Sequence, residues 1–454
     1  MNFLEICLVC LMTLLVAAPY WSAYRSPDRT WFWNPLVLFA AVFAYYFVVG
    51  PLVSLMLGNT YGYGLDLRGL MGKAWLAGIL GLGSIYVGFA IKTRPVRTRL
   101  VAVLDAPLRK RLWLNLGVLA GLGLTGFLYC AWVSGQSLGQ LLLPFHQGGG
   151  EEDSVEQVGL AAGNYLFLLI NCFIPGACLL VALTDRQPLR RRFWLVGLPV
   201  MVVLLFYLSV AFRHRIITLV LACAATAYLL RRQRPTPATL LGGAAGLVLL
   251  SGFIVLTRTY GRGLDLTQLG ELSLLEVFLG GFGDAGTFFT MGLVIESFPD
   301  VVPFVGLDPF WIALTIPIPR SLWPDKPYAA FLDYFEYITG TRGQAVPVTG
   351  EHYMMAGWIG VILGGLALGL IYRRFWEFYR ANPSNPFVVV IYAVAWALIF
   401  PIVNRGYLAQ TLMEFFFDLL PLVALFLFSR KAMLATPVRT RHPTPASVTA
   451  PAAT

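Results

Sequence analysis

Charged residues are scarce in this chain of 454 residues, since Asp, Glu, Lys and Arg make up only 12% of it while 58% is hydrophobic. Soluble domains contain roughly 25% charged residues, so the composition excludes an ordinary soluble enzyme. Uncharged apolar runs recur along the chain at close to the roughly 20 residues that cross a bilayer. Because lipid offers the backbone no hydrogen-bond partner, such runs form helices. The sequence therefore predicts an all-α polytopic membrane protein.

The common motifs for metals and nucleotides are also missing. The chain contains no DxD, no HExxH, no P-loop and no cluster of histidines with cysteines. A metal site and metal-dependent use of nucleotide sugars or ATP are therefore not expected. All six cysteines lie in apolar runs, and the CxxC pair Cys7 and Cys10 falls inside the first of them. This context favours helix packing over disulfide or zinc chemistry, so we expect no metal and no cofactor.

Eleven apolar segments have the length of transmembrane helices. The first carries Glu5 but no basic n-region and no small-residue cleavage site, which predicts a retained helix rather than a signal peptide. Two more apolar stretches, within residues 258–351, are broken by Pro and Gly and are expected to lie on the surface or re-enter the membrane; as full spans they would raise the count to thirteen. The eleven predicted helices cover roughly residues 3–20, 35–57, 70–91, 112–134, 161–183, 193–212, 216–230, 240–257, 353–372, 387–403 and 412–428.

Basic residues alternate between the loops and predict the topology. The positive-inside rule assigns loops rich in Lys and Arg to the cytoplasm, which puts the N-terminus outside and the C-terminus inside. Because topology accounts for most of the net charge of +10, that charge gives no support for a nucleic-acid partner. The basic segments are those at Arg25 and Arg29, at 92–111, 186–192, 231–234 and 373–380, and from Arg430 onward.

The chain divides into one large domain and a tail. Residues 1–434 are predicted to form a single transmembrane domain that includes a large external loop, residues 258–351. Residues 435–454 are rich in Pro, Ala and Thr and are expected to be a disordered cytoplasmic tail. A second external loop, residues 135–160, carries four carboxylates and no Lys or Arg, and is expected to form a flexible lid or rim.

Ten Lys and Arg residues are predicted to lie on the external side, where the positive-inside rule does not account for them. Only fifteen uncharged residues separate Arg215 from Arg231, and as a helix they span about 22 Å at 1.5 Å per residue, less than the roughly 30 Å hydrocarbon core. An arginine below the membrane surface is a functional-site candidate, whereas snorkelling to the interface is the alternative for Arg213 and Arg215. The ten are Arg68, Lys73, Arg213, Arg215, Arg258, Arg262, Arg320, Lys326, Arg342 and Arg405.

The large external loop holds several of these cations. It opens with RTYGRG, which contains Arg258, Tyr260 and Arg262, and a loop of this length is usually a functional lid or binding element. Further on, the prolines of IPIPRSLWPDKP hold Arg320 and Lys326 on a stiff, extended backbone. An interfacial Trp/Arg anchor is the alternative interpretation of this segment.

Further candidates lie on the last three predicted helices. Glu351 and His352 stand at the outer mouth of the ninth. Simple stabilisation of the helix dipole is one interpretation of Glu351, and for His352 the roles of general base and of hydrogen-bond donor to a sugar are both open. Arg405 lies in the last external loop. Glu414 and Asp418, at i and i+4, share a face and either neutralise an arginine or take part in chemistry. A glycine stripe on the ninth helix predicts close helix packing: Gly357, Gly360, Gly364, Gly365 and Gly369.

Several guanidinium groups at the outer interface suit a lipid-linked diphosphate, because the planar donor fork matches phosphate oxygens. With these residues the sequence resembles the Wzy-type O-antigen and oligosaccharide repeat-unit polymerases of bacterial inner membranes. The resemblance covers roughly residues 200–375 and is carried by RHRIITLVLACAATAYLL, which contains Arg215, by the large external loop, and by PIPRSLWPDKP and GEHYMMAGWIGVILGGLALG. The RX10G pattern described for some members is absent at the external arginines.

The resemblance implies a metal-independent, GT-C-like glycosyltransferase with a large periplasmic loop, embedded as a multi-pass protein in the bacterial inner membrane. It implies that an acceptor sugar attacks an undecaprenyl-diphosphate-linked oligosaccharide and displaces undecaprenyl diphosphate, with arginine replacing a metal at the leaving group. Membrane lipid and a chain-length regulator protein are the other partners it suggests. An O-antigen ligase that transfers glycan to the lipid A core and a lipid-linked oligosaccharide flippase, which is not an enzyme, remain the alternatives.

The resemblance also distributes roles among the candidate residues. Arg215, Arg258 and Arg320 are expected to bind the leaving diphosphate, and Glu351 or His352 to activate the acceptor. The residues expected to contribute to substrate binding are Arg213, His214, Tyr260, Arg262, Lys326, Arg342 and Arg405.

Overall fold

The structure is a helical bundle. It is a computed structural model, and within the part of the chain that it describes ten helices are long and apolar enough to cross a membrane. The chain is thus a multi-pass membrane protein of the all-α class. The described residues are 2–433 without 59–60, 63–64, 94–99, 101–105, 135–138, 140–141, 143–144, 147–164, 210–212, 260–262, 266–272, 283–285, 316–317, 319–321 and 328–344. The predicted tail, 435–454, lies outside them.

Each of the eleven predicted helices has a counterpart, although several are built from consecutive helical segments. Ten are long spans, and the eleventh, α11 (Arg213–Leu230), is shorter. In chain order the first spans are α1 (Phe3–Arg25); α2 (Pro35–Ala44), η2 (Tyr45–Val49) and α3 (Gly50–Met56); η3 (Leu67–Leu70) and α4 (Met71–Ala90); α5 (Ala106–Ser134); η4 (Tyr165–Cys172) and α8 (Phe173–Thr184); and α9 (Leu189–Arg192), η5 (Phe193–Gly197) and α10 (Leu198–Ser209). After α11 come α12 (Pro237–Thr257); α17 (Val348–Ala381); α18 (Pro386–Ala397) and α19 (Ile399–Asn404); and α20 (Leu408–Glu414), η8 (Phe415–Leu419) and α21 (Leu420–Met433).

The described part of the 258–351 loop contains short helices and no further span. These helices are α13 (Leu274–Gly280), α14 (Gly286–Ser297) and α15 (Asp308–Thr315). Almost every residue of α14 is buried, and it packs against α4 and α17, whereas several large apolar side chains of α15 are exposed. Very short strands join the loops: β1 (Tyr61–Gly62) pairs with β2 (Leu65–Asp66), and β5 (Gly263–Asp265) lies between β3 (Phe145–His146) and β4 (Arg258–Thr259).

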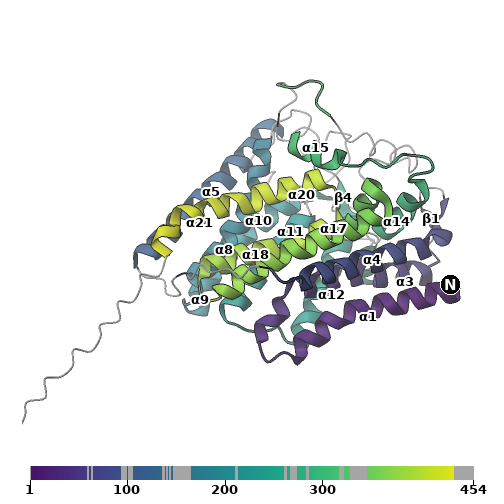
Figure 1. The fold of residues 1–454 in the computed structure, drawn as a ribbon. Helices are drawn as coiled ribbons and strands as arrows, with labels where there is room; N and C mark the ends of the chain where they lie inside the picture. Colours follow the sequence, from purple (N-terminus) through teal and green to yellow (C-terminus); the bar gives the residue numbers. More distant parts are fainter. Residues whose placement is uncertain are drawn as a thin grey trace, which may run out of the picture.

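The segments predicted to be cytoplasmic meet at one end of the bundle. Arg231 Nε lies 3.0 Å from Asp185 Oδ1, and Arg234 donates to the Tyr24 carbonyl. Arg232 donates to Ser384 Oγ at 2.7 Å. Residues far apart in sequence therefore share this end, which carries α9 in Figure 1. The alternation of charge along the sequence is thus matched by the arrangement of the loops.

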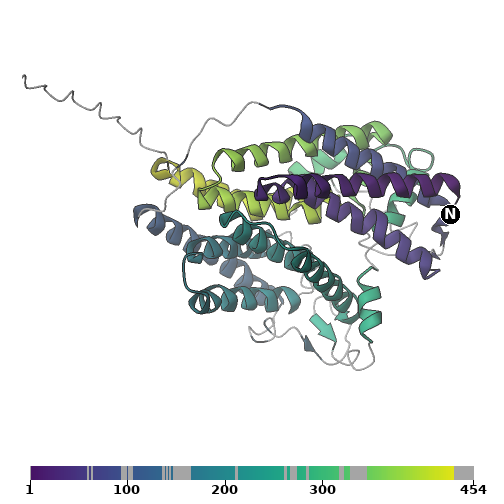
Figure 2. The same cartoon turned by 90° about the horizontal axis from the view of Figure 1, so that it is seen from below.

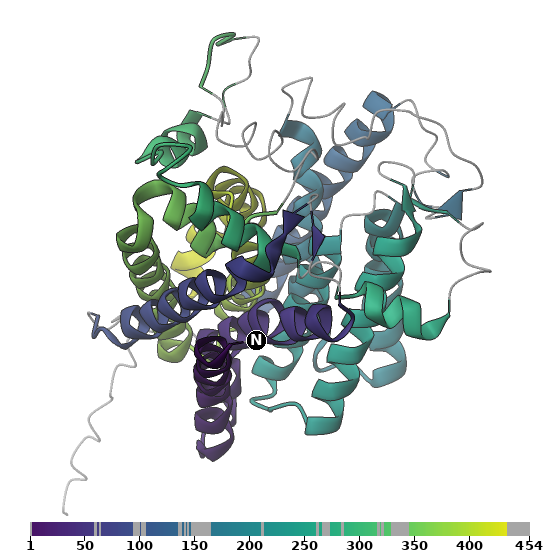
Figure 3. The ribbon, with the colours of Figure 1, turned by 90° about the vertical axis from the view of Figure 1, so that its right-hand side faces the viewer.

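The predicted external segments gather at the opposite end, where α1 begins (Figures 1 and 2). Lys73 and Glu296 form an exposed ion pair there, and the Gly406 amide donates to the Val346 carbonyl at 2.7 Å. Viewed onto this end, α14 and α15 lie on one side and β3 and α13 on the other (Figure 3). The β3–β5–β4 sheet joins the two predicted external loops, because β3 belongs to the first and the other strands to the second.

Helix α17 bends sharply near its start, and the glycine stripe explains how. Gly357 has a φ of +62°, a conformation that favours glycine. Beyond the bend, the His352 ring lies directly against Gly364, where an added Cβ would come within 2.2 Å of it. A Cβ at Gly369 would meet the backbone of α4, 2.2 Å from the Ile85 carbonyl oxygen. The predicted close packing at these glycines is confirmed.

Candidate functional site

A group of buried ionisable side chains lies between the first turn of α11 and the last span, where His214 Nε2 is 3.6 Å from Glu414 Oε1. We call it the charge cluster and define it as His214, Arg215, Glu414 and Asp418, all of them buried. Arg215 is only 5% exposed and Asp418 only 2%. Charged groups at this degree of burial are rare unless they are paired or serve a function.

The local sequence explains why Arg215 is inside the protein. Helix α11 begins at Arg213, so Arg215 falls in its first turn, and the helix of 18 residues is about 27 Å long at 1.5 Å per residue. The helix is too short to carry its first turn clear of a hydrocarbon core of roughly 30 Å. Burial of the Arg215 side chain disfavours snorkelling, which would leave the guanidinium exposed. The side chain of Arg213 lies outside the described part.

Arg215 is held by aromatic and acidic neighbours. Its Cζ atom lies 5.1 Å from the centre of the Phe167 ring, within the range of a cation–π interaction. The guanidinium also lies near enough to Asp418 and to Tyr207 for its charge to act on them. The Tyr207 hydroxyl donates to the Ile170 carbonyl at 3.0 Å, which fixes the phenol ring beside the arginine.

The two acidic residues have different surroundings. Glu414 Oε1 lies 3.6 Å from His214 Nε2 and accepts a hydrogen bond from Gln410 Nε2 at 3.2 Å. Asp418 lies on the π-helical segment η8, and its Oδ1 atom is buried without a hydrogen-bond partner among the described residues. π-Bulges are frequent at functional sites, and a buried carboxylate oxygen without a partner calls for a water or a ligand group.

Arg405 supplies a second cation close to the start of α20. It is half-buried after α19; its backbone N–H donates to the Pro401 carbonyl at 2.7 Å, while its side chain makes no hydrogen bond or ion pair within the described residues. Asn404 is buried beside it, and its Oδ1 atom likewise lacks a partner in the described part of the chain. Both groups are therefore available to a polar ligand at this end of the bundle.

Glu351, His352 and Lys326 are engaged in the packing of the outer end. Glu351 is buried, and its Oε1 atom accepts the Leu408 amide at 2.8 Å, at the first residue of α20. A carboxylate there stabilises the helix N-terminus. His352 packs on Gly364, and the Lys326 amine is buried and donates to the Ile318 carbonyl at 2.8 Å.

Substitution of Glu351 should separate its packing role from a chemical one. We expect Glu351→Ala to lower the free energy of unfolding by about 1–3 kcal/mol, because it leaves the Leu408 amide buried without an acceptor. Glu351→Gln should lose much less, since the amide oxygen can still accept. Thermal unfolding of the purified variants measures both. Equal losses would contradict the capping role, and a stable Glu351→Gln protein that has lost activity would identify Glu351 as the acceptor's base.

The remaining predicted residues are only partly covered. Tyr260, Arg262, Arg320 and Arg342 lie outside the described residues. The Arg258 backbone pairs with Leu264 in the β4–β5 ladder, at the end of the bundle that also holds the start of α11, and its side chain is not described. The roles expected for these five residues stay predictions.

Sequence reasoning gave no role to two members of this neighbourhood, Gln410 and Tyr207. A signal for Gln410 was present, because Gln410, Glu414 and Asp418 repeat at intervals of four and so share one helix face. Tyr207 lies within an apolar helix, and no pattern in the sequence marks it. Among the described residues, no group of three or more His, Cys, Asp or Glu is arranged to hold a metal ion.

No protein-family model, curated protein or solved structure matches this chain.

Proposed function

We propose that this protein polymerises undecaprenyl-diphosphate-linked oligosaccharide repeat units into O-antigen or exopolysaccharide at the periplasmic face of the bacterial inner membrane. The N-terminus is then periplasmic and the C-terminus cytoplasmic. Two features support this orientation: the basic segment 231–234 contacts Tyr24, Asp185 and Ser384 at one end of the bundle, and α1's first residues lie at the other end with the helices of the long loop.

The observation that carries the proposal is the burial of Arg215 within an acid-bearing cluster at the first turn of a short helix. A guanidinium there can bind a diphosphate through its planar donor fork in a site of low dielectric constant. Such a group stabilises the negative charge that develops on a departing diphosphate without a metal ion.

The reaction follows from these roles. The acceptor hydroxyl attacks the anomeric carbon of the growing lipid-linked chain, the bond from that carbon to the diphosphate oxygen breaks, and undecaprenyl diphosphate leaves with the electron pair. Arg215 binds the leaving group, with Arg258 and Arg320 as proposed partners and Arg262, Lys326, Arg342 and Arg405 assisting.

Two pairs of residues are candidates for accepting the proton that the acceptor hydroxyl releases. The resemblance favours Glu351 or His352. The geometry favours His214 with Glu414, since His214 precedes Arg215 on the same helix and its Nε2 atom lies 3.6 Å from a carboxylate oxygen. A histidine paired with a carboxylate is a common arrangement for moving a proton.

Loss of the gene should reveal which lipid-linked intermediate the protein consumes. We expect cells without it to accumulate single repeat units on undecaprenyl diphosphate or on the lipid A core, because flipping and ligation continue while polymerisation stops. Mass spectrometry of extracted lipids and gel profiles of the polysaccharide measure this. Full-length undecaprenyl-linked polymer would instead identify a ligase, and translocation of labelled repeats without bond formation by the reconstituted protein would identify a transporter.

A further inference from the structure

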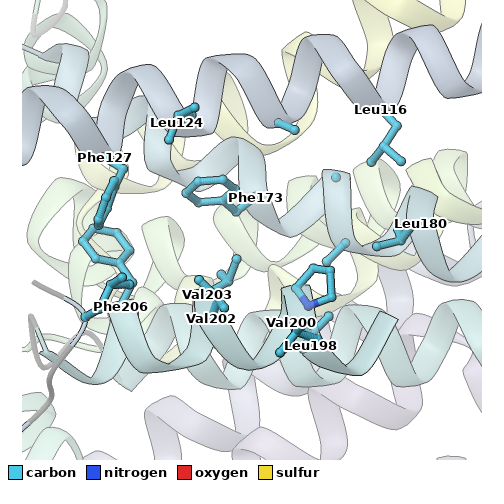
Figure 4. A pocket seen from close by; sticks show the side chains of 15 residues that line it. Leu116, Leu124, Phe127, Phe173, Leu180, Leu198, Val200, Val202, Val203 and Phe206 are labelled. Atoms are coloured by element: carbon cyan, nitrogen blue, oxygen red, sulfur yellow. The ribbon is translucent and has the colours of Figure 1, made fainter. Parts of the chain in front are cut away.

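An apolar groove lies between α5, α8 and α10, and we call it the α5–α10 groove. Its volume is about 530 Å³, within the roughly 300–1,000 Å³ of small-molecule sites. Its lining consists only of Leu, Ala, Phe, Gly, Pro and Val. Phe127 and Phe206 stand together at one end and Leu116, Leu180 and Leu198 at the other, with Phe173 along the floor (Figure 4).

The groove is about as deep as one leaflet of a membrane. On α5 its lining runs from Leu116 to Phe127, a rise of about 16 Å at 1.5 Å per residue, roughly half of a 30 Å hydrocarbon core. Helix α10 follows the basic segment at α9, so Phe206 marks the end of the groove farther from the basic loops. Residues 116–127 lie in the middle of the span Leu108–Val133, so the groove runs through the middle of the membrane with its Phe127 and Phe206 end toward the external loops.

The groove opens toward the lipid. Leu124 on α5 is 50% exposed, and Leu198 and Val202 on α10 are 56% and 44% exposed, although all three line the groove. Ala120 and Gly176 leave room between the helices because their side chains are small. A chain diffusing in the membrane can thus enter sideways without unfolding the bundle.

The end of the groove at Phe127 and Phe206 adjoins the charge cluster. The two phenyl rings are 4.8 Å apart. Tyr207 directly follows Phe206, and Cys130 lies one helical turn beyond Phe127; both lie near enough to Arg215 for its charge to act on them. An apolar channel one leaflet deep therefore leads to a buried guanidinium, which is the arrangement that suits a long apolar chain with an anionic head.

We propose that the α5–α10 groove binds the isoprenoid chain of a polyprenyl phosphate whose phosphate group lies at Arg215. The inference rests on the proposed function, since that function supplies a polyprenyl lipid, and deepens it by assigning where the lipid is bound. We infer a single isoprenoid chain as the occupant because the lining residues form one channel, with α5 and α10 at its sides and α8 at its base. A phospholipid, with two acyl chains and a larger headgroup, is the competing occupant.

The test uses the purified full-length protein and a polyprenyl phosphate with a photoreactive group in its chain. We expect crosslinks in peptides that contain 116–127 and 198–206. Ala120→Trp puts bulk into the groove from an exposed position, and should reduce labelling about tenfold, equivalent to about 1.4 kcal/mol of binding. The matched control is Ala245→Trp on the exposed face of α12, which should label like the wild type and elute identically on size-exclusion chromatography.

Competition identifies the occupant. Unlabelled polyprenyl phosphate should displace the probe, and polyprenol without phosphate should displace it much less; Arg215→Gln should remove that difference. Displacement by phosphatidylglycerol as strong as by polyprenyl phosphate would overturn the proposal in favour of a general lipid groove, and crosslinks confined to other helices would overturn it outright. Specific labelling in the groove of a protein whose loss leaves polymer intact would retain the binding site while rejecting the polymerase function.

Discussion

Replacement of Arg215 by lysine should reduce polymer formation by about 10²- to 10³-fold, the usual loss when one preorganised donor to a developing oxyanion is removed. Lysine keeps the positive charge beside Asp418, so the protein should still fold. It cannot reproduce the planar fork that contacts two phosphate oxygens at once. Arg215→Ala should lose at least as much activity and should also be less stable, because the acids of the charge cluster are then left without their cation.

Polysaccharide gel profiles at matched protein levels measure the effect of Arg215→Lys in cells that lack the native gene. Arg68→Lys is the control, since Arg68 is an exposed cation at the same end of the bundle and should behave like the wild type. Unchanged polymer length and yield in both Arg215→Lys and Arg215→Ala would remove the central support for the proposed polymerase.

Substitution of Asp418 by leucine should lower the free energy of unfolding by about 0.5–3 kcal/mol, the range for residues in one network, because Asp418 lies near Arg215 without forming an ion pair with it among the described residues. Asp418 is 2% exposed and interacts with Arg215 across the boundary between α11 and η8. The single variant leaves the guanidinium less compensated in a buried position. The double variant Arg215→Leu with Asp418→Leu removes both charges and should recover part of that stability while still forming no polymer.

The wild type, the two single leucine variants and the double variant are unfolded chemically in detergent, which gives the coupling energy between Arg215 and Asp418. We expect it within the 0.5–3 kcal/mol range of residues in one network. The exposed pair Lys73 and Glu296, whose Nζ and Oε2 atoms are 2.5 Å apart, provides a control cycle and should give less than about 1 kcal/mol. Additive losses for Arg215 and Asp418 would show that they do not interact, and recovered polymer in the double variant would exclude Arg215 from the reaction.

The proposed chemistry and lipid binding lie toward one end of the bundle. Arg215 is in the first turn of α11, Arg405 lies between α19 and α20, and the Phe127 and Phe206 end of the α5–α10 groove points toward the same, predicted external, side. A lipid-linked substrate could therefore keep its chain in the membrane while its sugar reaches the external loops. Binding of the lipid chain, coupling between the buried charges and formation of polymer are measured by three separate experiments.

The helices and their order could be predicted from the sequence alone, because the bilayer leaves an apolar run few other structures. The eleven predicted segments correspond to ten long spans and to α11. Alternating Lys and Arg predicted two groups of loops, and the contacts of Arg231, Arg232 and Arg234 bring several members of one group together. The sequence also singled out Arg215, through the short distance to the next basic residue.

Side-chain partners were decided only by the tertiary structure, because they join segments that are far apart in the chain. Glu414 was expected either to neutralise an arginine or to take part in chemistry, and the structure puts its Oε1 atom 3.6 Å from Nε2 of His214, two hundred residues earlier. Glu351 stood at a helix start, yet it caps a different helix through the Leu408 amide. The α5–α10 groove could not be foreseen either, since it depends on how three apolar helices leave space between them. Hydropathy and charge act on each segment separately, whereas packing depends on all of them together.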